Sequence, residues 1–134
     1  MYDKKQKAIA IAHSGWRGST LNIYKKTIET MKKRYHSKPE DILVCISPSL
    51  GPDSAEFQNY KTELPESFWQ FQIQPYYFDF WKISRWQLEE AGILPHHIEI
   101  AGMDTLSNPT DFFSHRRDKP SGRNATIAFL KTAP

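Results

Sequence analysis

Cysteine is almost missing from this sequence: Cys45 is the single one among 134 residues, so no disulfide can form within the chain. Small secreted domains usually rely on several disulfides, and we therefore expect a reducing, cytoplasmic setting. Long apolar runs are missing too. No stretch approaches the ~18 residues of a membrane span, and the first residues lack the apolar core of a signal peptide. We expect no membrane association.

A large excess of one charge is also missing, since the chain has 18 Lys and Arg residues and 15 Asp and Glu residues, a net charge of +3. Nucleic-acid binding normally needs a denser basic stripe, so we expect no nucleic-acid partner. Internal repeats and low-complexity linkers are missing as well. With 39% hydrophobic residues, the composition is ordinary for a globular protein, and we expect residues 1–134 to form a single domain.

Four apolar runs predict β-strands. The second of them, Ile-Leu-Val-Cys-Ile, is apolar throughout, as a strand covered on both faces would be, and we interpret Cys45 as a small core residue. The first run opens the chain with no element before it. Because a bare sheet edge invites pairing, we expect either a natural upstream portion or self-association through this amino-terminal strand. The runs lie at residues 7–13, 42–47, 98–101 and 125–131.

Two amphipathic stretches predict helices at residues 19–35 and 79–91. Ser19 or Thr20 can cap the first helix, because a hydroxyl accepts a bond from a free amide of the first turn. Asp79 caps the second, and Gly92 ends it. Helices alternating with strands predict an α+β fold, that is, a mixed α/β domain.

The densest chemistry follows the first strand, where His13 precedes Gly-Trp-Arg-Gly at residues 15–18. Ligands tend to bind at the carboxyl ends of strands in α/β sheets. At such a place His13 could ligate a metal or move a proton, and Arg17 could hold an anion. The residues alone equally allow a packed turn in which His13 bonds to backbone.

Two further loops carry candidate residues. Ser49 and Asp53 lie in a loop with two prolines after the second strand, which is either a ligand site or a rigid polar turn. Residues 114–124 hold several cations around Pro-Ser-Gly, and an arginine fork suits phosphate or carboxylate. A solvated hairpin is the alternative there. The adjacent histidines His96 and His97 would point to opposite faces and make a poor metal pair.

Taken together, three motifs in this order resemble the YfiH family, whose members are often labelled laccase-domain or polyphenol oxidase proteins. The resemblance covers nearly the whole chain but only the carboxyl-terminal portion of the longer family. It implies layered β-sheets flanked by helices, incomplete here at the amino end. The motifs are Ala-His-Ser-Gly-Trp-Arg-Gly at 12–18, Ser-Pro-Ser-Leu-Gly-Pro at 47–52, and Phe-Phe-Ser-His-Arg-Arg with Ser-Gly-Arg between 112 and 123.

The resemblance implies a zinc-dependent purine nucleoside phosphorylase, with adenosine deaminase activity in some members. Its zinc is held by two histidines and a cysteine, and the last histidine matches His13. The other two ligands lie upstream of Met1, in a His-Gly and a Thr-Ala-Asp-Cys motif that this chain does not contain. Because a catalytic zinc usually needs three protein ligands, we expect this chain to be inactive by itself.

The expected site residues follow from the matching motifs. His13 is the metal ligand, and His13 and Arg17 are the expected catalytic residues. Phosphate or nucleoside would contact Arg17 first, then Arg116, Arg123 and Ser49, with His115 a weaker candidate. Arg116 and its neighbour Arg117 point different ways in an extended chain, so we expect at most one to face the site. Asp53 and Asp104 stand where many family members have cysteine.

Two alternatives remain open from the sequence. The missing upstream ligands favour a truncated or degenerate module without catalysis, acting by packing or oligomerisation. The other alternative is a copper-dependent polyphenol oxidase. Copper oxidation of phenols usually draws on histidine-rich sites, and the 5 histidines of this chain do not cluster in the sequence.

Overall fold

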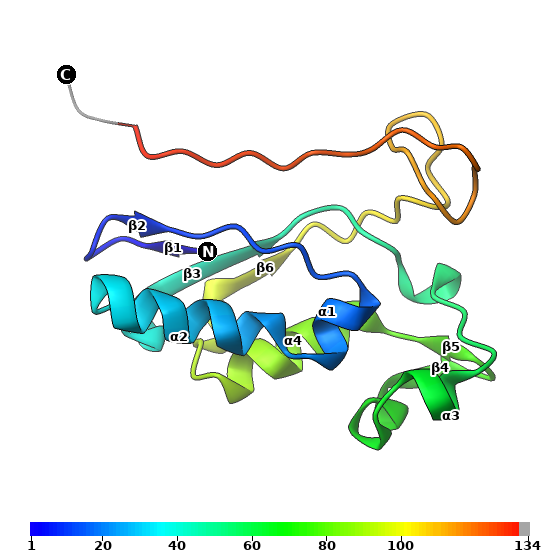
Figure 1. Cartoon of the computed structure of the whole chain (residues 1–134), viewed down its shortest axis with the longest axis horizontal. Coiled ribbons are helices and arrows are strands. Elements are labelled where there is room, and N and C mark those ends of the chain that lie inside the picture. The colour runs from blue at the N-terminus through cyan, green and yellow to red at the C-terminus, as the bar shows by residue number, and fades with distance from the viewer. Residues whose placement is uncertain (132–134) are drawn as a thin grey trace. The chain divides into compact units, whose positions relative to one another are not determined.

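A computed structural model describes residues 1–131 of the chain (Figure 1). They form two compact units, each built from more than one segment of the chain. Among the described residues, unit 1 contains 1–45, 84–99 and 127–131, and unit 2 contains 46–83 and 100–126. Helices and strands occur in both, which confirms the mixed α/β class. In the part described, no helix has the length and apolarity needed to cross a membrane.

Unit 1 is built around a four-stranded sheet in the order β2-β1-β3-β6. β1 pairs antiparallel with both of its neighbours, so that Tyr2 lies opposite Ile9 on one side and Leu43 on the other. The prediction that no element precedes the first apolar run is therefore wrong, because β1 does. The strands are β1 (Tyr2–Asp3), β2 (Ala8–Ile9), β3 (Ile42–Ile46) and β6 (Ile98–Ile100), the last two each preceded by a 3-10 turn, Pro39–Asp41 and Pro95–His97.

The turn between β1 and β2 explains why the first predicted strand is so short. The buried carboxylate of Asp3 accepts hydrogen bonds from the backbone N–H groups of Lys5 (2.9 Å) and Gln6 (3.0 Å). Burial alone would raise the pKa of Asp3, but the hydrogen bonds to its charged form outweigh burial and lower the pKa. The polar residues up to Lys7 are thus held in a turn, and pairing begins only at Ala8.

The first predicted helix is two helices, α1 (Trp16–Thr20) and α2 (Ile23–Tyr35). Asn22 breaks it by adopting the left-handed conformation (φ 49°), and its side chain accepts from the N–H of Lys25 at 3.1 Å. The prediction that Ser19 or Thr20 caps this helix is wrong, because both residues lie inside α1.

The second predicted helix is confirmed as α4 (Phe80–Glu90). Asp79 accepts from the N–H of Lys82 at 2.9 Å, as expected of its capping residue. Gly92 ends the helix at φ +92°, where a side chain would also lie 3.1 Å from Pro39. Within unit 1, Tyr24 of α2 and Ser84 of α4 share a buried hydrogen bond of 2.9 Å between their hydroxyls.

The interior strand β3 has one covered face. Ile42 and Val44 are 0% and 3% exposed, whereas Leu43 is 40% exposed and Cys45 is exposed. In Figure 1, α2 and α4 lie along the same side of this sheet. The predictions that both faces of this strand are covered and that Cys45 is a core residue are wrong, because the described helices cover a single face.

Unit 2 consists of short elements around a cluster of aromatic rings. The rings of Phe57 and Phe80 lie 5.2 Å apart, and those of Tyr60 and Phe78 also lie 5.2 Å apart. With Phe57, Phe68 and Phe78 buried, these rings form the core of unit 2. The elements are the 3-10 turns Pro52–Ser54 and Glu66–Phe71, α3 (Tyr60–Glu63), and the antiparallel strands β4 (Gln72–Gln74) and β5 (Tyr77–Phe78).

The prediction of a final strand at residues 125–131 is wrong. This segment is an extended coil with Ile127 83% and Phe129 79% exposed. No strand among the described residues offers its backbone to this segment, so strand-forming side chains alone do not make it part of a sheet.

Candidate functional site

The turn from β2 to α1 carries His13 on an exposed position. A side chain at Gly15 would place its Cβ 3.2 Å from Nε2 of His13, tighter than an ordinary contact. A Cβ at Gly18 would similarly lie 3.4 Å from the carbonyl oxygen of His13. Gly15 therefore leaves the space that the imidazole occupies.

Arg17 is exposed in the same turn. Its guanidinium carbon lies 4.4 Å from the ring centroid of Trp16, within the range of a cation–π contact. Throughout residues 1–131, no carbonyl or carboxylate accepts a hydrogen bond from the Arg17 side chain. Stacking thus orients this guanidinium while leaving its N–H donors available to an anion.

A buried amide from α4 supports this turn. Gln87, 4% exposed, donates from Nε2 to the carbonyl of Ser19 at 2.8 Å. The hydroxyl of Ser19 shares a hydrogen bond of 3.0 Å with the hydroxyl of Ser14, the residue that follows His13. Our sequence reasoning missed Gln87, although a polar residue among the apolar side chains of the predicted helix was a usable signal.

The described residues do not form a metal centre by themselves. Across residues 1–131, no group of three or more His, Cys, Asp or Glu side chains is placed to hold a metal ion. His13 offers one exposed imidazole, which fits one position of a ligand set and not the usual three of a catalytic zinc.

In unit 2, the loops after β3 and β6 are joined through Ser49. Its backbone N–H donates to Met103 at 3.1 Å, and its carbonyl accepts from Thr105 at 3.0 Å. Its hydroxyl accepts from the indole N–H of Trp81 at 2.8 Å. Ser49 therefore lies in a rigid polar turn, and Trp81 orients its hydroxyl.

Asp104 holds the same two loops together. Its carboxylate accepts hydrogen bonds from the hydroxyl of Ser54 and from the N–H of Leu106 (2.9 Å). Gly51 is needed beside it, because a Cβ there would lie 2.9 Å from Cβ of Asp104. Burial would raise the pKa of Asp104, but these hydrogen bonds outweigh it and the pKa is lowered.

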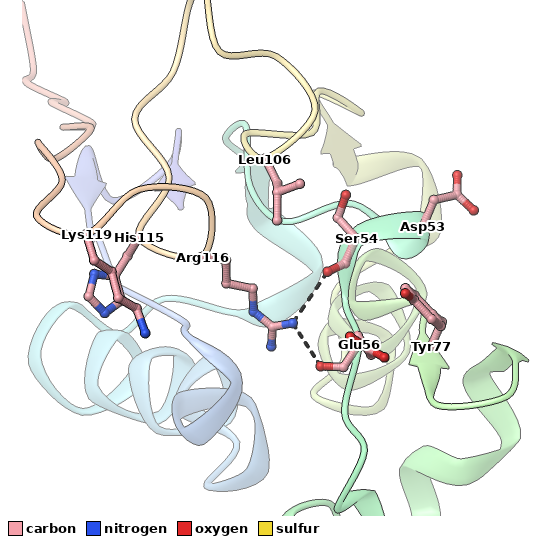
Figure 2. A pocket seen from close by; sticks show the side chains of 8 residues that line it. All are labelled: Asp53, Ser54, Glu56, Tyr77, Leu106, His115, Arg116 and Lys119. Carbon is pink, nitrogen blue, oxygen red and sulfur yellow. Dashed lines mark hydrogen bonds between the residues drawn. The ribbon is translucent and has the colours of Figure 1, made fainter.

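Arg116 lines a pocket of about 470 Å³ in unit 2, shown in Figure 2. Its Nη1 donates to the carbonyls of Glu56 (2.8 Å) and Ser54 (3.4 Å), and its guanidinium lies 4.9 Å from the ring centroid of Phe57. Cationic side chains come from one segment of the pocket wall and carboxylates from another. The lining residues are Asp53, Ser54, Glu56, Tyr77, Leu106, His115, Arg116 and Lys119.

The other two arginines of this region are bonded to main-chain carbonyls. Arg117 donates to the carbonyls of Thr105 (3.1 Å), Leu106 (2.9 Å) and Phe112 (2.8 Å) and pairs with Asp118. Arg123 donates from Nη1 to the carbonyls of Ser121 (2.9 Å) and Gly122 (3.0 Å). Of the neighbours Arg116 and Arg117, only Arg116 lines the pocket.

The chain belongs to the multi-copper polyphenol oxidoreductase laccase family, whose model matches residues 1–131. Curated relatives of this chain are named purine nucleoside phosphorylases. One from Bacteroides thetaiotaomicron is 32% identical over 126 residues, which are 87% of this chain and 47% of the relative. The human relative, purine nucleoside phosphorylase LACC1, is 36% identical over 128 residues, 87% of this chain and 29% of the relative.

Two solved structures share the fold and confirm the resemblance to the YfiH family. The hypothetical protein YfiH from Bacillus licheniformis matches with a TM-score of 0.77 and 28% identity, over 88% of this chain and 48% of that one. YlmD from Geobacillus stearothermophilus matches with a TM-score of 0.68 and 30% identity, over 85% and 48%. This chain spans about half the length of its bacterial relatives.

Proposed function

We propose that this chain is part of a purine nucleoside phosphorylase, which uses phosphate to release the base from a purine nucleoside. In that reaction a phosphate oxygen bonds to C1 of the ribose, the C1–N9 bond breaks, and the base leaves as ribose 1-phosphate forms. The supporting observation is the family match over residues 1–131 together with relatives named for this activity.

Arg17 is our first candidate for the residue that binds phosphate. Its guanidinium is exposed, oriented by Trp16 and free of carbonyl partners within the described chain. A guanidinium in this state can offer two parallel N–H donors to an anion. Arg116, Arg123 and Ser49 remain weaker candidates, because each already bonds to other groups of the protein.

For the cofactor we propose zinc, with His13 as one ligand and the remaining ligands supplied by polypeptide outside this chain. The exposed imidazole above Gly15 supports this role. Zinc, when bound, would lower the pKa of a water molecule and so supply a nucleophile at neutral pH, which is the chemistry that adenosine deamination requires. We propose deamination as a second activity of the same protein, in a cytoplasmic setting that suits its single cysteine.

The test is phosphate-dependent release of base from inosine, adenosine and guanosine by the full-length protein, with and without a chelator. We expect release that needs phosphate and falls on chelation. Arg17→Gln should lower kcat/KM for phosphate by about 10–100-fold, equivalent to ~1.4–2.7 kcal/mol, without changing the unfolding midpoint. Arg34→Gln, an exposed arginine near the end of α2, is the matched control. A protein that releases base from none of these nucleosides is not a phosphorylase.

Measurements of activity and of bound metal distinguish two other functions from phosphorolysis. Copper-dependent oxidation of phenols, which the family description names, predicts phenol turnover that requires copper. A non-catalytic module predicts no activity and no metal. Stoichiometric zinc that binds to the purified chain and is lost in His13→Ala would contradict the module.

A further inference from the structure

Unit 2 has another pocket, of about 410 Å³, formed by α3 and the antiparallel pair β4 and β5. Small-molecule sites in proteins usually have volumes of about 300–1,000 Å³, so this pocket has the size for one small ligand. Aromatic and apolar side chains form much of its wall, and none of the lining side chains carries a charge. The lining residues are Tyr60, Gln72, Ile73, Gln74, Pro75 and Tyr76.

Tyr76 has a backbone conformation that is unfavourable for a bulky residue. Its φ is +72°, in the left-handed region that glycine adopts without strain. A residue of positive φ directly after proline is the arrangement of a type II turn, where glycine or asparagine usually stands. The carbonyl of Tyr76 accepts from the N–H of Phe57 at 2.7 Å, so main-chain atoms alone hold the turn in place. Glycine would therefore suit this backbone better than tyrosine.

Burial does not explain the tyrosine either, because Tyr76 is 48% exposed. Its ring centroid lies 6.5 Å from that of Tyr60, at an interplanar angle of 62°. Tyr60 is itself fixed by ring contacts with Trp69 (5.4 Å) and Phe78 (5.2 Å). A fixed ring and a half-exposed ring on strained backbone thus form adjoining walls of the pocket. Strained backbone of this kind is often found at ligand-binding sites.

The polar groups of this pocket are available to a ligand. Among residues 1–131, the side-chain amides of Gln72 and Gln74 have no hydrogen-bond partner in the protein. The same holds there for the hydroxyls of Tyr60 and Tyr76. Each amide offers a donor and an acceptor in one plane, which matches the edge of an adenine ring. A tyrosine ring offers a face on which a flat base stacks.

We propose that this pocket binds a purine base or nucleoside and shares no residue with the turn that carries His13 and Arg17. The flat ring lies against Tyr76, and the amides of Gln72 and Gln74 bond to its edge. The choice of a purine among flat, uncharged ring compounds rests on the proposed function, because the relatives are named purine nucleoside phosphorylases. Binding itself does not require catalysis, so a protein without phosphorylase activity would still hold the base.

The experiment measures binding of adenine to the chain by isothermal titration calorimetry in phosphate-free buffer. Free adenine has no glycosidic bond, so binding is measured without turnover. We expect saturable binding. Tyr76→Gly should weaken it about 10-fold or more, as expected for the loss of a stacking ring. The urea midpoint of this variant should stay the same or rise, because glycine relieves the strain at φ +72°.

Two further variants test the amides and the specificity of the effect. Gln72→Met/Gln74→Met keeps the side-chain length and removes both amides, so it should weaken adenine binding about 10-fold with an unchanged urea midpoint. Tyr35→Ala is the matched control, because Tyr35 is also 48% exposed but lies at the end of α2 in unit 1. It should bind adenine as the original chain does.

Three results would overturn the proposal. The chain does not bind adenine; it binds adenine equally well as Tyr76→Gly and loses it as Arg17→Gln; or the urea midpoint of Tyr76→Gly falls steeply, which would assign the ring to the fold. If adenine does not bind but a decaproline peptide does, the occupant is a proline-rich segment, the other ligand that aromatic grooves take. None of these results alters phosphate-dependent base release by the full-length protein, so the two proposals fail separately.

Discussion

The arginines of two loops differ in whether main-chain carbonyls accept their hydrogen bonds. In unit 2, Arg116, Arg117 and Arg123 donate to main-chain carbonyls and hold irregular chain together. In unit 1, Arg17 stacks on Trp16 and donates to no carbonyl in the described structure. The same side chain thus closes a loop in one place and stays available in the other. An exposed arginine in a motif that resembles a family's is therefore a ligand candidate only after the partners of its N–H donors have been accounted for.

The sharpest test of this contrast is Arg117→Met, for which we expect the largest loss of stability. Three carbonyls lose a charged donor, and the Arg117 side chain is only 22% exposed, so water replaces it incompletely. The free energy of unfolding should fall by about 2–3 kcal/mol. Urea unfolding followed by fluorescence measures it. An unchanged unfolding midpoint would show that the carbonyl bonds of Arg117 do not stabilise the fold.

Arg116→Met should cost less, about 1.5 kcal/mol, because its two carbonyl bonds and its contact with Phe57 lie at an exposed position. Arg116→Lys keeps the charge but not the fork, and should recover less than half of the loss. The same urea titration applies. Full recovery with lysine would show that charge rather than carbonyl bonding is what matters there.

Asp104→Asn tests the loops that Arg117 also contacts, and we expect a loss of about 1 kcal/mol at pH 7, after allowing for solvent screening. Because the pKa of Asp104 is lowered in the folded protein, its stabilisation is complete above the ordinary value of 3.8 and disappears as pH falls through the lower folded pKa. Thermal melts of both proteins from pH 7 to pH 2.5 should therefore begin to converge below about pH 4 and come closer as the pH falls further. A constant difference across this range would contradict the assignment.

Arg17→Met should have the smallest effect on stability, below about 0.5 kcal/mol, as is usual for an exposed side chain without structural partners. The prediction pairs with the Arg117 variant, since the two differ in what accepts their donors and not in charge. Equal losses at both positions would erase the distinction between a structural and an available arginine.

Local chemistry made some of this structure predictable. Asp79 before an amphipathic stretch and Gly92 after it mark the ends of α4, because both act on their own neighbouring backbone. The break at Asn22 escaped prediction, since a left-handed residue inside a continuous apolar pattern leaves no periodic trace. The motif carrying His13 and Arg17 was visible in the sequence, and their roles as site residues stay predictions, as does the single domain.

Two wrong predictions, the burial of Cys45 and the strand at residues 125–131, have a common physical cause. Apolar residues at Cys45 and across residues 125–131 indicate burial, but burial and pairing depend on what other polypeptide surrounds them. Arg116 illustrates the converse: its carbonyl partners, Ser54 and Glu56, lie some sixty residues away, beyond the reach of any local pattern.

Gly15 limits which substitutions the turn from β2 to α1 accepts during evolution. Any codon for glycine becomes one for alanine by a single base change, and the methyl group it adds would intrude on Nε2 of His13 at 3.2 Å. The imidazole would then have to shift by a few tenths of an ångström although the histidine itself is untouched. The position of the His13 imidazole thus depends on its neighbour, and a survey of variants that watches only the histidine would overlook this dependence.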